Sequence, residues 1–201
     1  MPNIVDVNYA HTGKSTSTNK MGMREMQEKV FAARDSQYLL IKAPPASGKS
    51  RALMFLGLDK LYNQGIKKVI VAVPEKSIGG SFDSVPLTKF GFFADWVVEP
   101  KNNLCTPGGE KSKVAAFQRF LAGDDKILIC THATLRFSFD AIDESQLNDT
   151  LLAIDEFHHV SSDVEANRLG KLLHSVMNKS NAHIVAMTGS YFRGDTVPVL
   201  S

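Results

Sequence analysis

Short apolar segments recur along the chain at intervals that predict a parallel sheet. The segments typical of buried strands are residues 38–41, 69–73, 127–130, 151–154 and 183–187, with residues 96–98 as a weaker candidate. Helical spacing of apolar residues predicts helices at residues 21–34, 49–62, 111–122 and 164–177. Because strands alternate with helices, the order predicts an α/β domain of three layers, with a mostly parallel central sheet covered on both faces.

Two segments lack this periodicity. Residues 1–20 are largely polar and rich in Ser, Thr and Asn, which favours an N-terminal leader ahead of a domain at residues 21–201. Residues 79–109 are rich in Gly, Pro and Asn, and their secondary structure is the least defined by the pattern.

Composition narrows the class of protein. An apolar fraction of 43% is ordinary for one globular domain, and 23 basic against 21 acidic residues leave a balance of +2, so any nucleic-acid contact must be local. Cys105 and Cys130 lack metal-ligand spacing, so we interpret both as structural. The longest apolar run, residues 52–58, is too short for a membrane helix, and no secretory signal opens the chain, so a cytoplasmic protein without a membrane partner is expected.

The strongest local signal is the segment APPASGKS at residues 43–50, between a predicted strand and a predicted helix. A loop in this position can wrap phosphates with its backbone N–H groups, aided by the helix dipole. Lys49 would reach the β- and γ-phosphates of ATP, and the Ser50 hydroxyl would ligate Mg²⁺. The expected nucleotide contacts are Pro45, Ala46, Ser47, Gly48, Lys49, Ser50 and Arg51. The alternative is a chance Gly-Lys-Ser turn before a helix.

A second signal is the acidic pair Asp155-Glu156, which ends the apolar segment at residues 151–154. Carboxyl ends of parallel strands are where ligands bind in α/β folds. Asp155 would hold Mg²⁺, and Glu156 would orient or deprotonate the attacking water. Alone, such a pair is more often a solvated turn, but together with Lys49 it favours a phosphoryl-transfer site.

An ordered set of segments resembles the first RecA-like domain of superfamily 2 helicases and translocases of the DExH group, over about residues 21–195. The segments are Arg24-Glu25-Met26-Gln27 (adenine motif), residues 43–50 (motif I), Val71-Ala72-Val73-Pro74 (Ia), residues 130–135 (Ib), residues 155–158 (II) and Met187-Thr188-Gly189-Ser190 (III). The resemblance implies a P-loop NTPase that uses ATP and Mg²⁺, and it places the strand before motif III between those of motifs I and II.

The resemblance also implies roles for individual residues. Gln27 would read the adenine edge, although a bond to nearby backbone satisfies its amide equally well. His158, Thr188 and Ser190 would couple the ATP site to movement, with plain turn chemistry as the alternative.

Nucleic-acid contacts are expected at Pro74, Thr131 and Thr134, through main-chain amides and small hydroxyls. Ordinary loop chemistry is the alternative for these residues.

We therefore expect the ATP-binding half of a nucleic-acid helicase or translocase. Residues 191–195 resemble restriction and repair translocases, which favours DNA over RNA. In the resemblance, a second RecA-like domain of the full-length protein supplies an arginine finger, so this chain is expected to be a monomer that hydrolyses ATP very slowly. An RNA helicase and a non-translocating ATP-dependent switch are the alternatives, while a small-molecule kinase lacks a recognisable lid.

Overall fold

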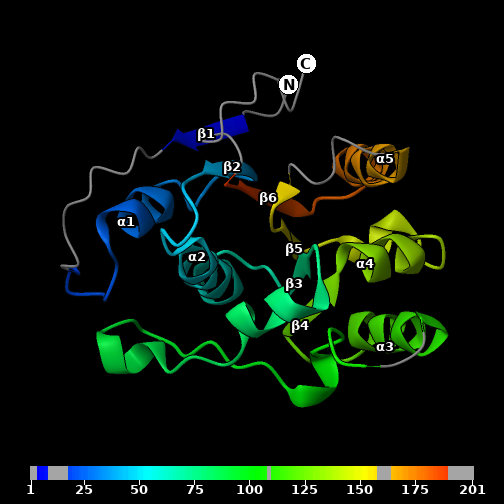
Figure 1. Ribbon diagram of the computed structural model, residues 1–201, viewed down its shortest axis with the longest axis horizontal. Helices are drawn as coiled ribbons and strands as arrows, with labels where there is room; N and C mark the ends of the chain where they lie inside the picture. The colour runs from blue at the N-terminus through cyan, green and yellow to red at the C-terminus, as the bar shows by residue number, and fades with distance from the viewer. Residues whose placement is uncertain (1–3, 9–17, 108–109, 158–163, 190–201) are drawn as a thin grey trace.

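Six strands form one sheet in the order β1-β2-β6-β5-β3-β4, and every neighbouring pair is parallel (Figure 1). The strands are β1 (Ile4–Asn8), β2 (Tyr38–Lys42), β3 (Lys68–Val73), β4 (Ile127–Thr131), β5 (Thr150–Ile154) and β6 (His183–Thr188). This computed structural model describes residues 4–8, 18–107, 110–157 and 164–189. The predicted α/β class is confirmed, and β6 lies between β2 and β5 as the resemblance implies.

Helices cover both faces of the sheet, which makes three layers (Figure 1). One face carries α1 (Glu25–Ala32) and α2 (Lys49–Asn63), and the other carries α3 (Glu110–Ala122), α4 (His132–Phe139) and α5 (Val164–Lys179). Short 3₁₀ segments are η1 (Lys76–Phe82), η2 (Leu87–Phe90), η3 (Pro100–Asn102) and η4 (Glu144–Leu147).

Strand β3 shows why its sequence reads as a continuous apolar run. Val69, Val71 and Val73 join the core beneath α1 and α2, whereas Ile70 and Ala72 join the core beneath α3, α4 and α5. Side chains of a strand alternate between faces, so a strand covered on both sides must be apolar at every position.

Between residues 21 and 139, three features differ from the sequence prediction. Trp96 does not start a strand: it forms one isolated bridge with Val85, and its buried indole donates a 2.9 Å hydrogen bond to the Phe82 carbonyl. Helix α1 begins four residues later than predicted, because Arg24 is an extended N-cap. Helix α4 was not predicted, because its eight residues follow β4 without a connecting loop.

Strand β1 lies within the segment that we expected to be a leader. Its five residues, IVDVN, pair in parallel with β2 at the edge of the sheet. The prediction missed this strand because a five-residue apolar pattern interrupted by Asp6 is weak next to a long polar segment.

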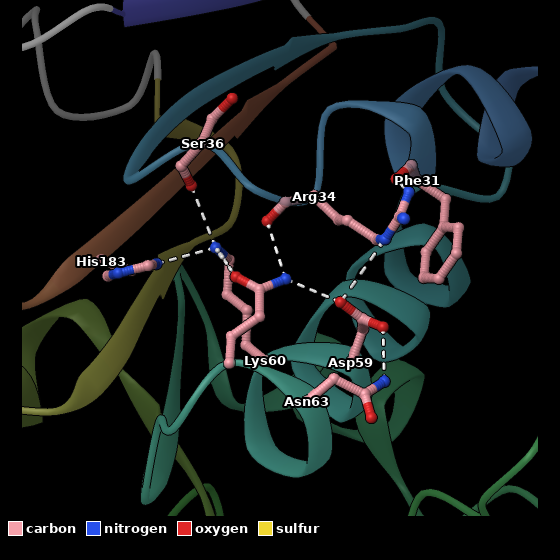
Figure 2. Close-up of polar contacts among 8 residues, drawn as sticks. Phe31, Arg34, Ser36, Asp59, Lys60, Asn63 and His183 are labelled. Carbon is pink, nitrogen blue, oxygen red and sulfur yellow. Dashed lines mark hydrogen bonds and ion pairs between the residues drawn. The ribbon is translucent and has the colours of Figure 1, made fainter.

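A polar network fixes the amino-terminal edge of the sheet, around the buried Lys60 of α2 (Figure 2). The Lys60 ammonium donates to the Ser36 carbonyl at 2.9 Å and to the Gln64 side chain at 3.3 Å. It also lies 2.7 Å from Nδ1 of His183, the first residue of β6. Burial lowers the pKa of Lys60 to about 8, and burial together with the Lys60 charge lowers the pKa of His183 to about 4.

Asp59, next to Lys60, extends this network toward α1 (Figure 2). Its carboxylate accepts hydrogen bonds from Asn63 at 2.7 Å and from Gln64 at 2.6 Å, and it lies 3.6 Å from the Arg34 guanidinium. The end of α2 is therefore bound to the α1–β2 connection and to the start of β6. The opposite edge, where the strands end, carries the predicted ligand-binding loops.

None of the helices in the described part of the chain is long and apolar enough to cross a membrane.

Candidate nucleotide-binding site

The loop between β2 and α2 has the conformation of an anion cradle. Ala46 and Gly48 have left-handed φ angles of 59° and 92°. A Cβ atom on Gly48 would lie 2.6 Å from Nε2 of Gln27, so only glycine fits there without a shift of that amide. Gly48 is the N-cap of α2, has no capping side chain, and is followed by a first turn without acidic residues, so the positive end of the helix suits an anion.

Lys49 is the first residue of α2, and its side chain turns back over this loop. The ammonium donates to the carbonyls of Ala43 at 3.0 Å and Pro44 at 3.1 Å, and it lies 3.8 Å from Oε1 of Glu156. It is 8% exposed. A buried cation beside the loop's N–H groups is the arrangement that binds phosphate charge.

Asp155 and Glu156 leave the end of β5 in a tight turn. The Asp155 amide donates to the Ala72 carbonyl of β3 at 2.9 Å, and its carboxylate accepts from the Glu156 amide at 3.0 Å. Burial raises the pKa of Asp155 to about 6, helped by the charge of Glu156 and opposed by the Glu156 amide and Lys49. A cation next to Asp155 would favour its ionised form, which fits a metal ligand.

Glu156 has a left-handed φ of 48°, which is costly for a residue with a side chain. This backbone conformation occurs in the turn that brings the Glu156 side chain close to Lys49. Lys49 and Glu156, 107 positions apart in sequence (156 minus 49), thus meet at one edge of the sheet, as the order of the strands requires.

Residues at the end of β6 contact both the phosphate loop and the acidic turn. The Thr188 carbonyl accepts from the Ala43 amide at 3.2 Å, and the next amide, that of Gly189, donates to Oε2 of Glu156 at 3.2 Å. A Cβ atom on Gly189 would lie 3.2 Å from the Lys49 ammonium and 3.4 Å from Oε1 of Glu156. Sequence reasoning assigned a role to Thr188 and missed the Gly189 amide, because main-chain groups leave no mark in side-chain patterns.

Gln27 lies against the phosphate loop. Its side-chain oxygen accepts from the Arg24 amide at 2.9 Å, and its Nε2 donates to the Gly48 carbonyl at 3.2 Å. The residue is 2% exposed. In this conformation the side-chain amide bonds to nearby backbone at both ends, and its contact with an adenine edge stays a prediction.

The two threonines of motif Ib lie at the start of α4. Thr131 is the N-cap of α4: its hydroxyl accepts from the Thr134 amide at 3.1 Å and lies 3.0 Å from the Thr134 hydroxyl. Thr131 is 6% exposed and Thr134 is fully buried. These hydroxyls therefore cap a helix in this structure, and the expected nucleic-acid contacts of Thr131 and Thr134 stay a prediction.

The remaining predicted residues differ in their exposure, and two of them lie outside the described residues. Pro45 and Ala46 are exposed in the loop, whereas Ser50, Arg51 and Pro74 are half-buried near the carboxyl edge. The Ser47 hydroxyl is buried and has no hydrogen-bond partner among the described residues. His158 and Ser190 lie outside the described residues.

His132 is a further residue whose position the sequence did not disclose. From the first position of α4, its Nε2 lies 2.9 Å from the carbonyl oxygen of Asp155. The beginning of α4 is therefore tied to the acidic turn across the end of β3.

A sequence profile described as DEAD/DEAH box helicase matches residues 24–194. The chain belongs to the DEAD/DEAH box helicase family. It is 64% identical over 200 residues to YeeB of Bacillus subtilis (strain 168), a protein named as an ATP-dependent helicase. That match covers the whole of this chain and 33% of YeeB, so the chain spans about a third of that relative's length.

Solved helicase structures share the fold of this family member. The Hef helicase domain of Pyrococcus furiosus aligns with a TM-score of 0.62 and 20% identity, over 88% of this chain and 34% of its own. Helicase Lhr of Mycobacterium smegmatis, solved with ssDNA and AMP-PNP, aligns with a TM-score of 0.58 and 18% identity, over 82% of this chain and 22% of its own. UvsW of bacteriophage T4 gives a TM-score of 0.53 at 14% identity, over 86% of this chain and 54% of its own.

Proposed function

We propose that this domain is the ATP-binding half of an ATP-dependent DNA helicase or translocase, which hydrolyses ATP with Mg²⁺ once a second RecA-like domain completes the site. The observation that carries the proposal is the convergence of the Lys49 ammonium, the Glu156 carboxylate and the Asp155 turn at one edge of the sheet. Family membership supports nucleotide use, and the share of YeeB beyond this chain leaves room for a second domain.

Each residue has a defined task in this proposal. Lys49 and the loop amides bind the phosphates, and Ser50 and Asp155 would hold Mg²⁺, which neutralises phosphate charge. Glu156 orients the attacking water and accepts its proton. The Lys49 ammonium and the Gly189 amide hold the Glu156 carboxylate in place, so its orientation depends on both motif I and motif III.

Thr188 would couple the ATP site to movement through its position at the end of β6. His158 and Ser190 stay proposals from the resemblance alone. The preference for DNA has two supports: residues 191–195 resemble restriction and repair translocases, and the structurally similar Lhr was solved with ssDNA.

The test uses a longer protein that includes the region following residue 201, assayed for ATP hydrolysis with DNA, with RNA and with neither. DNA should stimulate turnover most. Glu156→Gln should retain nucleotide affinity and lose ~10²–10⁴-fold in rate, whereas Glu99→Gln, an exposed glutamate remote from the site, should match wild type. RNA as the better stimulant would favour the RNA helicase, and nucleotide binding without any stimulation would favour a switch.

The 201-residue chain supplies a second arm of this test. It should bind ATP weakly and hydrolyse it very slowly, because a missing arginine finger costs ~10³–10⁵ in rate. Robust stimulated turnover by this chain alone would contradict the need for a second domain.

A further inference from the structure

A cavity of about 200 Å³ is lined by residues of α4 and α5. These two helices lie on the face of the sheet opposite α1 and α2 (Figure 1). Its lining residues are Arg136, Phe139 and Asp140 from α4 and its end, and Arg168, Lys171 and Leu172 from α5. Three cations against one carboxylate give this cavity a charge balance of +2 (3 minus 1). The net charge of the whole chain is also +2, so the residues outside this cavity sum to zero and the excess positive charge lies here.

The cations are placed to receive an external anion. Arg168 and Lys171 are exposed, and a spacing of three residues puts them on one side of α5. Neighbouring like charges at this spacing destabilise a helix slightly, so folding does not require the pair. Arg136 reaches the same cavity from α4.

An exposed aromatic ring accompanies these charges. Phe137 is 44% exposed, and the Arg136 guanidinium lies 5.2 Å from the centre of its ring. Cations that follow a phosphate backbone, next to an aromatic face on which a base can stack, are the features that proteins use for single-stranded nucleic acid.

The position of the cavity relates it to the proposed function. Helix α4 starts at the carboxyl end of β4, and its first residue, His132, contacts the acidic turn at the Asp155 carbonyl. Thr131 and Thr134, at the start of this helix, are buried. Among the described residues, the cations of α4 and α5 that line the cavity can meet a phosphate here.

We propose that the α4–α5 groove, defined by Arg136, Arg168 and Lys171, binds single-stranded nucleic acid, with the exposed Phe137 beside Arg136 at its margin. The three cations take backbone phosphates, and Phe137 stacks on a base. This inference rests on the proposed function and extends it, because it adds α5 and the outer side of α4 to the contact surface.

The decisive measurement is the salt dependence of binding. Each phosphate contact adds a fixed amount to the slope of log K against log salt concentration. A labelled single-stranded oligonucleotide is titrated with the 201-residue chain from low to moderate salt. The double variant Arg168→Ala/Lys171→Ala should lower the slope of log K against log salt by ~1.4, since one phosphate contact on a single strand contributes ~0.7.

Two controls separate charge from structure. Arg119→Ala/Lys67→Ala removes the same two residue types from exposed positions near the amino-terminal ends of β3 and β4. It should leave the slope nearly unchanged. Arg168→Lys keeps the charge and should keep the slope. Phe137→Ala should lower affinity roughly tenfold without changing the slope, because stacking is not ionic.

Binding of a fluorescent ATP analogue, measured on every variant, distinguishes the two ways to fail. If the wild-type chain binds the analogue and the strand, but the α5 double variant has the slope of its control, the groove is refuted and the proposed function stands. If the chain binds the analogue but no DNA or RNA at any salt, the nucleic-acid part of the proposed function fails and this inference fails with it.

Discussion

His183 should make the free energy of unfolding fall as the pH drops from 7 to 5. Burial and the neighbouring Lys60 ammonium lower the pKa of His183 from 6.5 to about 4, because both disfavour the imidazolium ion in the folded state. The unfolded chain therefore takes up its proton first. Stability from this group is complete above pH 6.5 and is lost as the pH falls toward 4.

The magnitude follows from the linkage of protonation to folding. A pKa difference of 2.5 between the folded and unfolded states (6.5 minus 4) corresponds to about 3.4 kcal/mol when fully expressed. Between pH 7 and pH 5 the free energy of unfolding loses only about 1.8 kcal/mol of this contribution. Because His183 is half-buried, solvent screening reduces the expected loss to about 1 kcal/mol.

The assay is urea denaturation of the 201-residue chain at pH 7 and pH 5, followed by circular dichroism. His183→Gln can still accept a hydrogen bond from Lys60 but has no proton to gain, so its loss between the two pH values should be about 1 kcal/mol smaller than that of wild type. His174→Gln, on the exposed side of α5, is the matched control and should behave as wild type. Equal losses in wild type and His183→Gln would refute the reasoning.

Further predictions concern the nucleotide site and the core. Lys49→Ala should lower the affinity for a fluorescent ATP analogue at least ~10-fold, about 1.4 kcal/mol, by titration; unchanged affinity would remove Lys49 from the site. Gly48→Ala should cost about 1–2 kcal/mol of stability in urea melts, because φ is left-handed and the new Cβ meets Gln27. Burial raises the pKa of the Cys130 thiol, so iodoacetamide should label it in urea and not in the folded chain; labelling in both would contradict its burial.

Much of the fold could be predicted because its signals are local. The five apolar segments predicted as strands became β2 to β6, since a strand buried on both faces must be apolar throughout. The phosphate loop was equally visible, because a strand, a small-residue loop and a helix follow one another directly.

The rest depends on tertiary packing. Thr131 and Thr134 have the same residue type whether they face a ligand or cap a helix, and only the formation of α4 shows the capping role. The Gly189 amide and the Lys60–His183 contact join segments far apart in the sequence. No pattern within a short window can report such contacts.

The end of strand β6 links the phosphate loop to the acidic turn. Its final carbonyl is bonded to the first residue of the phosphate loop, and the next amide is bonded to the carboxylate that faces the lysine. The Thr188 carbonyl and the Gly189 amide belong to one peptide group, so a rearrangement at the phosphate loop or at Glu156 would displace that same group.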